Sequence, residues 1–326
     1  MRTPLFAAAL LACAAFITPA AAGVGFQHLT IPDPGHAPIE VGVWYPTDAK
    51  TSDQPIELGL QPVATDAPVR GDHLPLVLIS HGHGGSYAGH VDTALALANA
   101  GYVVAALTHT GDNWRDDSQA TAMWERPRQL KVLDDYMLGA WSGHARIDPS
   151  RIGAFGFSAG GFTVLVAAGG EPDLAAVGPH CADHPQFYTC KLVADRHVTS
   201  FHLPYPWVHD PRIRAVVSAA PALGFAFSQE GLEKVNEPLQ LWRAADDQIL
   251  PQPYYAEAVR QNLPQAPETH VVDHAGHFDF LAPCSEALAK QVPEICVSEP
   301  GFDRAAFHAD FDRQVVAFFD RTLGEK

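Results

Sequence analysis

Charged side chains are scarce in this chain, and basic ones are the scarcest. Among 326 residues, Asp and Glu number 37 whereas Lys and Arg number only 21, which leaves a formal net charge of −16. Nucleic acids and anionic membranes attract basic surfaces, so this balance argues against either as a partner. The hydrophobic share of 47% is ample for one large core. We therefore expect residues 23–326 to form a single domain.

Long apolar runs are missing after the N-terminus. The first residues read MRTPLFAAALLACAAFITPAAAG, with one arginine, an apolar stretch and three alanines before Gly23. This pattern predicts a cleaved signal peptide over residues 1–22 and hence an exported protein, periplasmic or secreted. Cys13 follows Leu-Leu-Ala, which weakly resembles a bacterial lipobox, so a lipoprotein is the alternative. No later run approaches the roughly 20 apolar residues of a membrane span.

Cysteine is rare as well, with four residues after the leader. They form two close pairs, Cys181 with Cys190 and Cys284 with Cys296. An even number in an exported protein predicts disulfides, and local pairing is the economical choice among three connectivities. The alternative is a metal site, because histidines flank Cys181, but neither pair has the C-x-x-C spacing of a zinc knuckle.

Apolar, β-branched runs alternate with helical segments along the whole chain. Strands are predicted at 39–46, 74–80, 102–109, 151–157, 212–221, 238–244 and 269–273, and helices at 94–101, 126–141, 160–170 and 303–323. The first of these strands alternates in polarity and is expected to be half-exposed. The alternation predicts an α/β fold, with a mostly parallel sheet covered by helices on both faces. Residues 171–211, rich in proline and histidine, interrupt it and are expected to form a small cap near the carboxyl ends of the strands.

The stretch GAFGFSAGGF, at 153–162, contains the pattern G-x-S-x-G between a predicted strand and a predicted helix. At such a sharp turn the serine has a strained backbone and projects its hydroxyl above the sheet. Glycine two residues before and after it avoids collisions with neighbouring backbone. Ser158 is therefore predicted to be a nucleophile, whereas no G-x-G-x-x-G pattern indicates a dinucleotide site.

A serine nucleophile needs a base and an acid that orients it, and on this type of sheet the chain order is serine, acid, histidine. Asp246 and Asp247 end a predicted strand, and only one of two neighbours can face the histidine. We predict His277 as the base, because it follows Ala275 and Gly276 in a tight loop.

An acyl-transfer site also needs donors for the developing oxyanion. One is expected to be the backbone N–H of Ala159, directly after the nucleophile. The other is expected from the loop SHGHGGS at 80–86, and we choose the N–H of His83. The alternative, a metal bound by the two histidines of this loop, is disfavoured because glycine stands where metallohydrolases commonly carry aspartate.

Four segments together resemble the α/β-hydrolase superfamily: VWYPTD (43–48), SHGHGGSYAGH (80–90), GFSAGG (156–161) and DPRIRAVVSAAPA (210–222). More narrowly, the chain resembles the bacterial branch of dienelactone-hydrolase-like proteins and platelet-activating-factor acetylhydrolase relatives. The resemblance spans about residues 25–325. It favours Asp247 as the acid, because DQILP is similar to a pattern that follows the acid in many such enzymes. Dienelactone hydrolases carry cysteine as nucleophile, so Ser158 favours ester hydrolysis instead.

The sequence thus predicts an exported serine esterase for small esters with short acyl chains, which needs no cofactor. The oligomeric state is not indicated. The alternatives are a phospholipid esterase of the acetylhydrolase type or a lipase. A prolyl-oligopeptidase-type peptidase is less favoured, since the roughly 130 residues before the serine are too few for a propeller domain. A non-catalytic binding protein is disfavoured because serine, acid and histidine occur in order.

Overall fold

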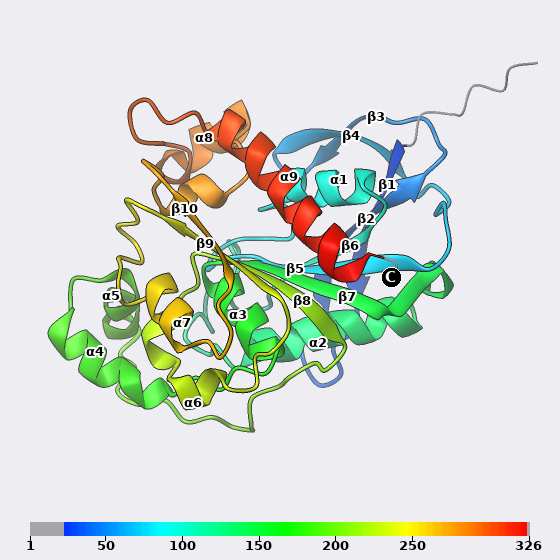
Figure 1. Cartoon of the computed structure of the whole chain (residues 1–326). Coiled ribbons are helices and arrows are strands. Elements are labelled where there is room, and N and C mark those ends of the chain that lie inside the picture. Colours follow the sequence, from blue (N-terminus) through cyan, green and yellow to red (C-terminus); the bar gives the residue numbers. More distant parts are fainter. Residues whose placement is uncertain (1–22, 325–326) are drawn as a thin grey trace, which may run out of the picture.

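A ten-stranded sheet runs through the centre of the structure, a computed structural model that describes residues 23–324 (Figure 1). In spatial order the strands are β10-β9-β8-β7-β5-β6-β2-β1-β4-β3. Their bounds are β1 Gly23–Ile31, β2 Ile39–Thr47, β3 Ser52–Ile56, β4 Gly59–Thr65, β5 Leu74–Ser80, β6 Val103–Thr108, β7 Ile147–Phe157, β8 Ile213–Ala219, β9 Leu239–Ala244 and β10 Glu268–Val272.

The six strands from β6 to β10 in this order run parallel to their neighbours, whereas β2 is antiparallel to both β6 and β1. Strands β5 and β6 are buried along almost their whole length. Their continuous apolar sequences follow from this position, since helices cover both faces of a parallel sheet. The predicted α/β class is therefore confirmed.

Helices pack in two layers (Figure 1). Helices α1 (Val91–Asn99) and α9 (Arg304–Leu323) cover one face, and α2 (Glu125–Gly139), α3 (Ala159–Ala167) and α7 (Ala256–Asn262) cover the other. Helix α3 is buried along its whole length. The remaining α-helices are short: α4 (Val177–Asp183), α5 (Tyr188–Asp195), α6 (Gln229–Leu232) and α8 (Glu286–Gln291).

The prediction of a half-exposed strand at 39–46 is wrong. Eight of the nine residues of β2 are buried, because its side chains pack into the hydrophobic core on both faces of the sheet, Val41 and Val43 on one face and Trp44 on the other. Gly42 is one of the non-hydrophobic positions that made the strand appear to alternate. Because it has no side chain, it leaves space that the rings of Trp44 and Tyr87 fill. Sequence alternation indicated one open face, but aromatic side chains cover it.

Both predicted disulfides are present. Cys181–Cys190 joins α4 to α5 within the 171–211 segment, and Cys284–Cys296 closes the loop that carries α8. Among residues 23–324, none of the helices combines the length and apolar character needed to cross a membrane. The signal-peptide and lipobox predictions fall on residues 1–22, outside the described residues.

Candidate active site

Ser158 lies at the sharp turn between β7 and α3. Its backbone has φ +56° and ψ −117°, a strained conformation for a residue with a side chain. A Cβ atom at Gly156 would lie 2.0 Å from the carbonyl oxygen of Gly160, and one at Gly160 would lie 1.8 Å from that of Ser80. Neither position can hold a side chain, so the two glycines of G-x-S-x-G allow the strand, the helix and β5 to meet here.

The three residues predicted as nucleophile, base and acid lie in hydrogen-bond contact. His277 Nε2 is 3.0 Å from Ser158 Oγ, and His277 Nδ1 is 2.8 Å from Asp247 Oδ2. A carboxylate only accepts, so Nδ1 donates to Asp247 and Nε2 accepts from the serine hydroxyl. All three side chains are buried. This is the arrangement in which a histidine can remove the proton of a serine hydroxyl.

Asp247 follows β9 and is held by its own loop. Its Oδ1 accepts hydrogen bonds from the backbone amides of Ile249 and Leu250, at 3.0 and 2.7 Å. Burial alone would raise the pKa of Asp247, but His277 and these amides outweigh it and hold the pKa below its usual value. Its neighbour Asp246 points away, with a half-exposed side chain near the exposed His274. Asp247 therefore remains a carboxylate facing the imidazole.

Helix α9 supports the turn that carries His277. This 3-10 turn, His277–Phe280, includes Asp279, whose Oδ2 accepts from the amide of Gly276 at 2.8 Å. Arg304 Nε donates to Asp279 Oδ1 at 3.0 Å, and His308 Nε2 lies 2.8 Å from the Asp279 carbonyl oxygen. Two side chains one turn apart on α9 thus fix the position of the turn.

His83 and Ala159, the predicted oxyanion donors, line the same pocket as Ser158. The loop that carries His83 approaches the nucleophile closely, since a Cβ atom at Gly82 would be 3.3 Å from Ser158 Cβ. The His83 ring itself is occupied: its Nδ1 lies 2.5 Å from Asp112 Oδ1. This contact occupies Nδ1 of the ring, and the backbone N–H of His83 remains the candidate oxyanion donor.

Behind this loop lies a buried arginine that the sequence did not single out. Arg126 of α2 pairs with Asp112 through Nη1 at 2.5 Å, and its Nη2 donates to the carbonyl oxygen of His81. Its Nε donates to Thr163 Oγ1, which in turn donates to the carbonyl of Ala159 at 2.7 Å. Burial would raise the pKa of Asp112, but Arg126 and His83 together hold it well below its usual value. One guanidinium therefore links both predicted oxyanion segments.

His81 is a structural residue of the same loop. Its Nε2 accepts from the amide of His109 at 2.9 Å, so Nδ1 carries the hydrogen and donates to the Gly82 carbonyl at 2.5 Å. Burial and the charge of Arg126 lower the pKa of His81 to about 3. A neutral ring with both nitrogens occupied offers no metal ligand.

The pocket above Ser158 is small and mostly apolar, with a cavity volume of about 60 Å³. Its floor includes Ser158 and Ala159, at the turn from β7 into α3. One wall comes from the 171–211 segment, which contributes Leu174, Val177, Tyr188, Thr189, Leu192, Val193 and Phe201. The disulfide Cys181–Cys190 links the two helices of this wall.

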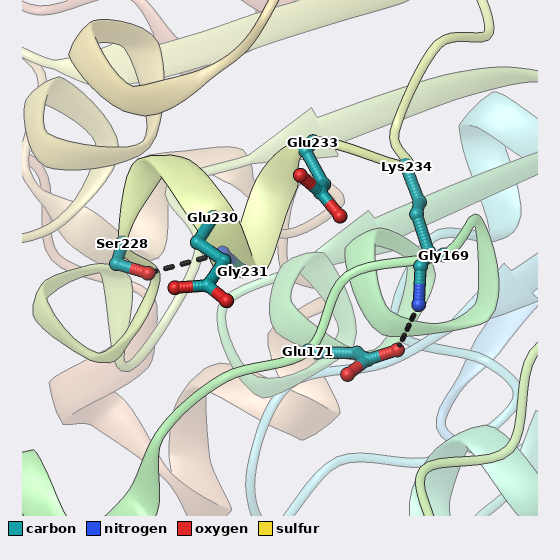
Figure 2. Close-up of a pocket in the computed structure, with 7 residues that line it drawn as sticks. All are labelled: Gly169, Glu171, Ser228, Glu230, Gly231, Glu233 and Lys234. Carbon is teal, nitrogen blue, oxygen red and sulfur yellow. Dashed lines mark hydrogen bonds and ion pairs between the residues drawn. The ribbon is translucent and has the colours of Figure 1, made fainter.

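A larger depression of about 260 Å³ lies beside α6, apart from this pocket (Figure 2). Its lining carries three glutamates and one lysine, and Lys234 pairs with Glu171 at 2.7 Å across it. The serine there, Ser228, accepts from the amide of Gly231 as the cap of α6. Because this hydroxyl has neither a histidine nor a buried setting, the depression lacks the groups for acyl transfer.

Comparison with known proteins agrees with this architecture. Residues 90–180, which include Ser158, match the prolyl oligopeptidase family. A stretch of 110 residues is 31% identical to the protein named "Putative esterase NocK" of Nocardia uniformis subsp. tsuyamanensis, and covers 33% of this chain and 32% of that protein. A ferulic acid esterase from Streptomyces cinnamoneus superimposes with a TM-score of 0.59 at 21% identity, covering 95% of this chain and 92% of that one. The chain has the α/β-hydrolase fold.

Proposed function

We propose that this protein is a serine hydrolase that cleaves small carboxylic esters with short acyl groups. The observation that carries the proposal is the continuous hydrogen-bonded series Ser158–His277–Asp247 at the floor of a mostly apolar pocket. The partial match to an esterase and the fold supply independent support.

In the acylation step, the Ser158 hydroxyl attacks the ester carbonyl carbon while His277 Nε2 takes its proton. Asp247 holds the imidazole in the required tautomer and stabilises the imidazolium that forms. The backbone amides of Ala159 and His83 donate to the oxyanion of the tetrahedral intermediate. The tetrahedral intermediate then collapses: the bond between the carbonyl carbon and the alcohol oxygen breaks as His277 gives its proton to that oxygen. The alcohol departs, and the acyl group remains on Ser158.

Deacylation repeats these roles with water. His277 removes a proton from a water molecule, which attacks the acyl carbon, and the carboxylic acid leaves as Ser158 regains its proton. No step in this sequence changes an oxidation state or requires a cofactor.

The 171–211 segment acts as a cap that limits the acyl group. The cavity of about 60 Å³ is well below the roughly 150 Å³ of a protein cavity that holds benzene. A disulfide and several prolines stiffen the segment, so the pocket resists opening for long chains. Two disulfides also fit an exported protein, in agreement with the predicted signal peptide.

A peptidase is the second candidate, because residues 90–180 match the prolyl oligopeptidase family. The same three residues would perform amide cleavage, with His277 protonating an amine leaving group. The two candidates differ in leaving group and in the size of the group that must enter the pocket.

The test compares matched substrates on the purified protein. We expect fluorophosphonate to label Ser158, hydrolysis of p-nitrophenyl acetate and butyrate, and no comparable hydrolysis of a benzyloxycarbonyl-Gly-Pro p-nitroanilide. The variant Ser158→Ala should fold and lose at least about a thousandfold in kcat. Retention of one tenth of the turnover by this variant would refute the mechanism, and preference for the anilide would establish the peptidase.

A further inference from the structure

A second group of ionisable side chains lies between α1 and α9, outside the Ser158 pocket. Asp92 belongs to the first turn of α1, and His308 and Asp312 lie one turn apart on α9. One ligand atom from each of the three lies within 4.8 Å of the others. His308 is 3% exposed and Asp92 is 25% exposed, and the two facing atoms, His308 Nδ1 and Asp92 Oδ2, are both buried, so the group is enclosed.

The orientation of the His308 ring is fixed by its other nitrogen. Nε2 lies 2.8 Å from the carbonyl oxygen of Asp279, and a carbonyl only accepts, so Nε2 carries a hydrogen. A neutral ring then presents the lone pair of Nδ1 to Asp92 Oδ2, 2.7 Å away. Neither of these two atoms has another hydrogen-bond partner within residues 23–324. Two electron-rich atoms at this distance require a positive charge between or beside them.

The carboxylates are also oriented by their neighbours. The amide of Thr93 donates to Asp92 Oδ1 at 2.9 Å, and the hydroxyl of Thr93 donates to Asp312 Oδ1 at 2.7 Å. Metal-binding histidines usually donate their second ring N–H to a carbonyl or carboxylate, and metal-binding carboxylates are themselves hydrogen-bonded. The Asp92–His308–Asp312 group has both properties: His308 donates to a backbone carbonyl, and both carboxylates accept hydrogen bonds from Thr93.

We propose that Asp92, His308 and Asp312 bind a divalent cation of the zinc type. One imidazole and two carboxylates form a mixed nitrogen and oxygen set that suits Zn²⁺, with water completing a tetrahedral shell. Adjacent ligands of such an ion are about 3.4 Å apart for bonds of about 2.0–2.1 Å. On binding, the 2.7 Å contact between Asp92 and His308 therefore widens, and any ligand atoms as far apart as 4.8 Å move closer. Two ionised carboxylates and a neutral imidazole carry two negative charges, which one divalent cation balances.

The bound ion links two helices and, through His308, the turn of His277. Asp279 accepts from His308 and lies two residues from His277. The ion therefore stabilises the fold at the point where α9 supports the Ser158 pocket, without contacting substrate. The proposal does not depend on ester hydrolysis.

The experiment measures zinc binding to the tag-free protein after dialysis against EDTA and then chelator-free buffer. Isothermal titration with ZnCl₂ is expected to give one ion per chain, and Zn²⁺ should raise the melting temperature. Co²⁺ should give the intense visible absorption of a four-coordinate site. Asp312→Asn keeps the acceptor for Thr93, and His308→Gln keeps a donor for Asp279, yet each should weaken binding at least about tenfold.

The matched control is Asp310→Asn, a partly exposed position on the same helix that pairs only with Arg313 among the described contacts. This variant should bind zinc as the unchanged protein does. A wild-type protein that binds no stoichiometric zinc would show that a proton on His308 supplies the positive charge, and would overturn the proposal. Equal zinc binding by Asp312→Asn, His308→Gln and wild type would also overturn it, because the ion would then occupy surface histidines.

Discussion

Two buried histidine–aspartate pairs, His277 with Asp247 and His308 with Asp92, contact or include the 3-10 turn His277–Phe280. They differ in the group that faces the second nitrogen of the histidine ring. His277 Nδ1 lies 2.8 Å from Asp247, and its Nε2 faces the hydroxyl of Ser158. His308 Nδ1 lies 2.7 Å from Asp92, and its Nε2 faces a backbone carbonyl. Both rings are almost fully buried, at 4% and 3% exposed.

The difference decides what each pair can do. A hydroxyl can give up its proton to the lone pair of His277, so this ring can act as a base. A carbonyl has no proton to give, and it fixes the hydrogen of His308 on the wrong nitrogen for such a role. A histidine beside a buried aspartate is therefore insufficient evidence for catalysis. The group that faces the second ring nitrogen, a hydroxyl or a carbonyl, decides whether the histidine can act as a base.

The largest expected effect comes from exchanging each histidine for glutamine. His277→Gln removes the base, so kcat on p-nitrophenyl butyrate should fall by at least about 10⁴-fold. His308→Gln can still donate to Asp279, so kcat should fall less than about tenfold while the melting temperature decreases. Steady-state kinetics and thermal unfolding of both variants check the comparison. Similar losses of kcat in the two would mean that His308 takes part in the reaction.

Next in size is the contrast between the neighbouring aspartates after β9. Asp247→Asn leaves the imidazole in the wrong tautomer and should lower kcat about a thousandfold or more. Asp246→Asn alters a half-exposed side chain 3.9 Å from His274 and should change kcat less than about threefold. The reverse ranking would transfer the role of the acid to Asp246.

A smaller effect is expected from the arginine behind the oxyanion loop. Arg126→Lys cannot contact Asp112, the His81 carbonyl and Thr163 together, so the amides of His83 and Ala159 should shift. A misplacement of about 1 Å costs up to about a hundredfold, so kcat should fall about ten- to a hundredfold with KM nearly constant.

Arg128→Lys is the control for this change, because Arg128 lies on the same helix and contacts Asp33 and Glu125 instead. It should keep kcat within about twofold, since Arg128 contacts neither the His81 carbonyl nor the Thr163 hydroxyl that connect Arg126 to the oxyanion segments. An Arg126→Lys protein that is folded and fully active would show that the network only stabilises the loop. A rise in KM alone would place its effect on substrate binding.

The Ser158 turn illustrates what the sequence could predict. Its pattern is local: two glycines, a serine and the flanking strand and helix lie within ten residues. The steric contacts that require the glycines involve Gly160 within this segment and Ser80 of the neighbouring strand β5. The order of serine, acid and histidine along the chain then restricted the partners to residues at the ends of later strands. Asp246 and Asp247 could be told apart in space only by the direction of each side chain.

Arg126 and the Asp92–His308–Asp312 group illustrate what the sequence could not predict. Arg126 lies on a helix whose amphipathic pattern indicates a buried face but does not show which charged residue enters it. Asp92 and His308 are separated by more than 200 positions in the sequence. No spacing rule connects residues on two different helices that pack side by side on one face of a sheet. Such partners follow from the packing of α1 against α9, which local patterns do not encode.

The smallest expected effect concerns the wall that the 171–211 segment forms over the pocket. Each acyl methylene that fits contributes less than about 1 kcal/mol, so kcat/KM for p-nitrophenyl esters should rise modestly to about four to six carbons and then fall. Leu192→Ala shortens a side chain of this wall and so enlarges the pocket. The acyl length that gives the highest kcat/KM should increase by about two carbons, with a change of a few-fold in kcat/KM for any one ester. Leu203→Ala, in the same segment but exposed and absent from the pocket lining, should leave the profile unchanged. A maximum at palmitate, or activation by lipid vesicles, would mean that the segment opens and that the protein is a lipase.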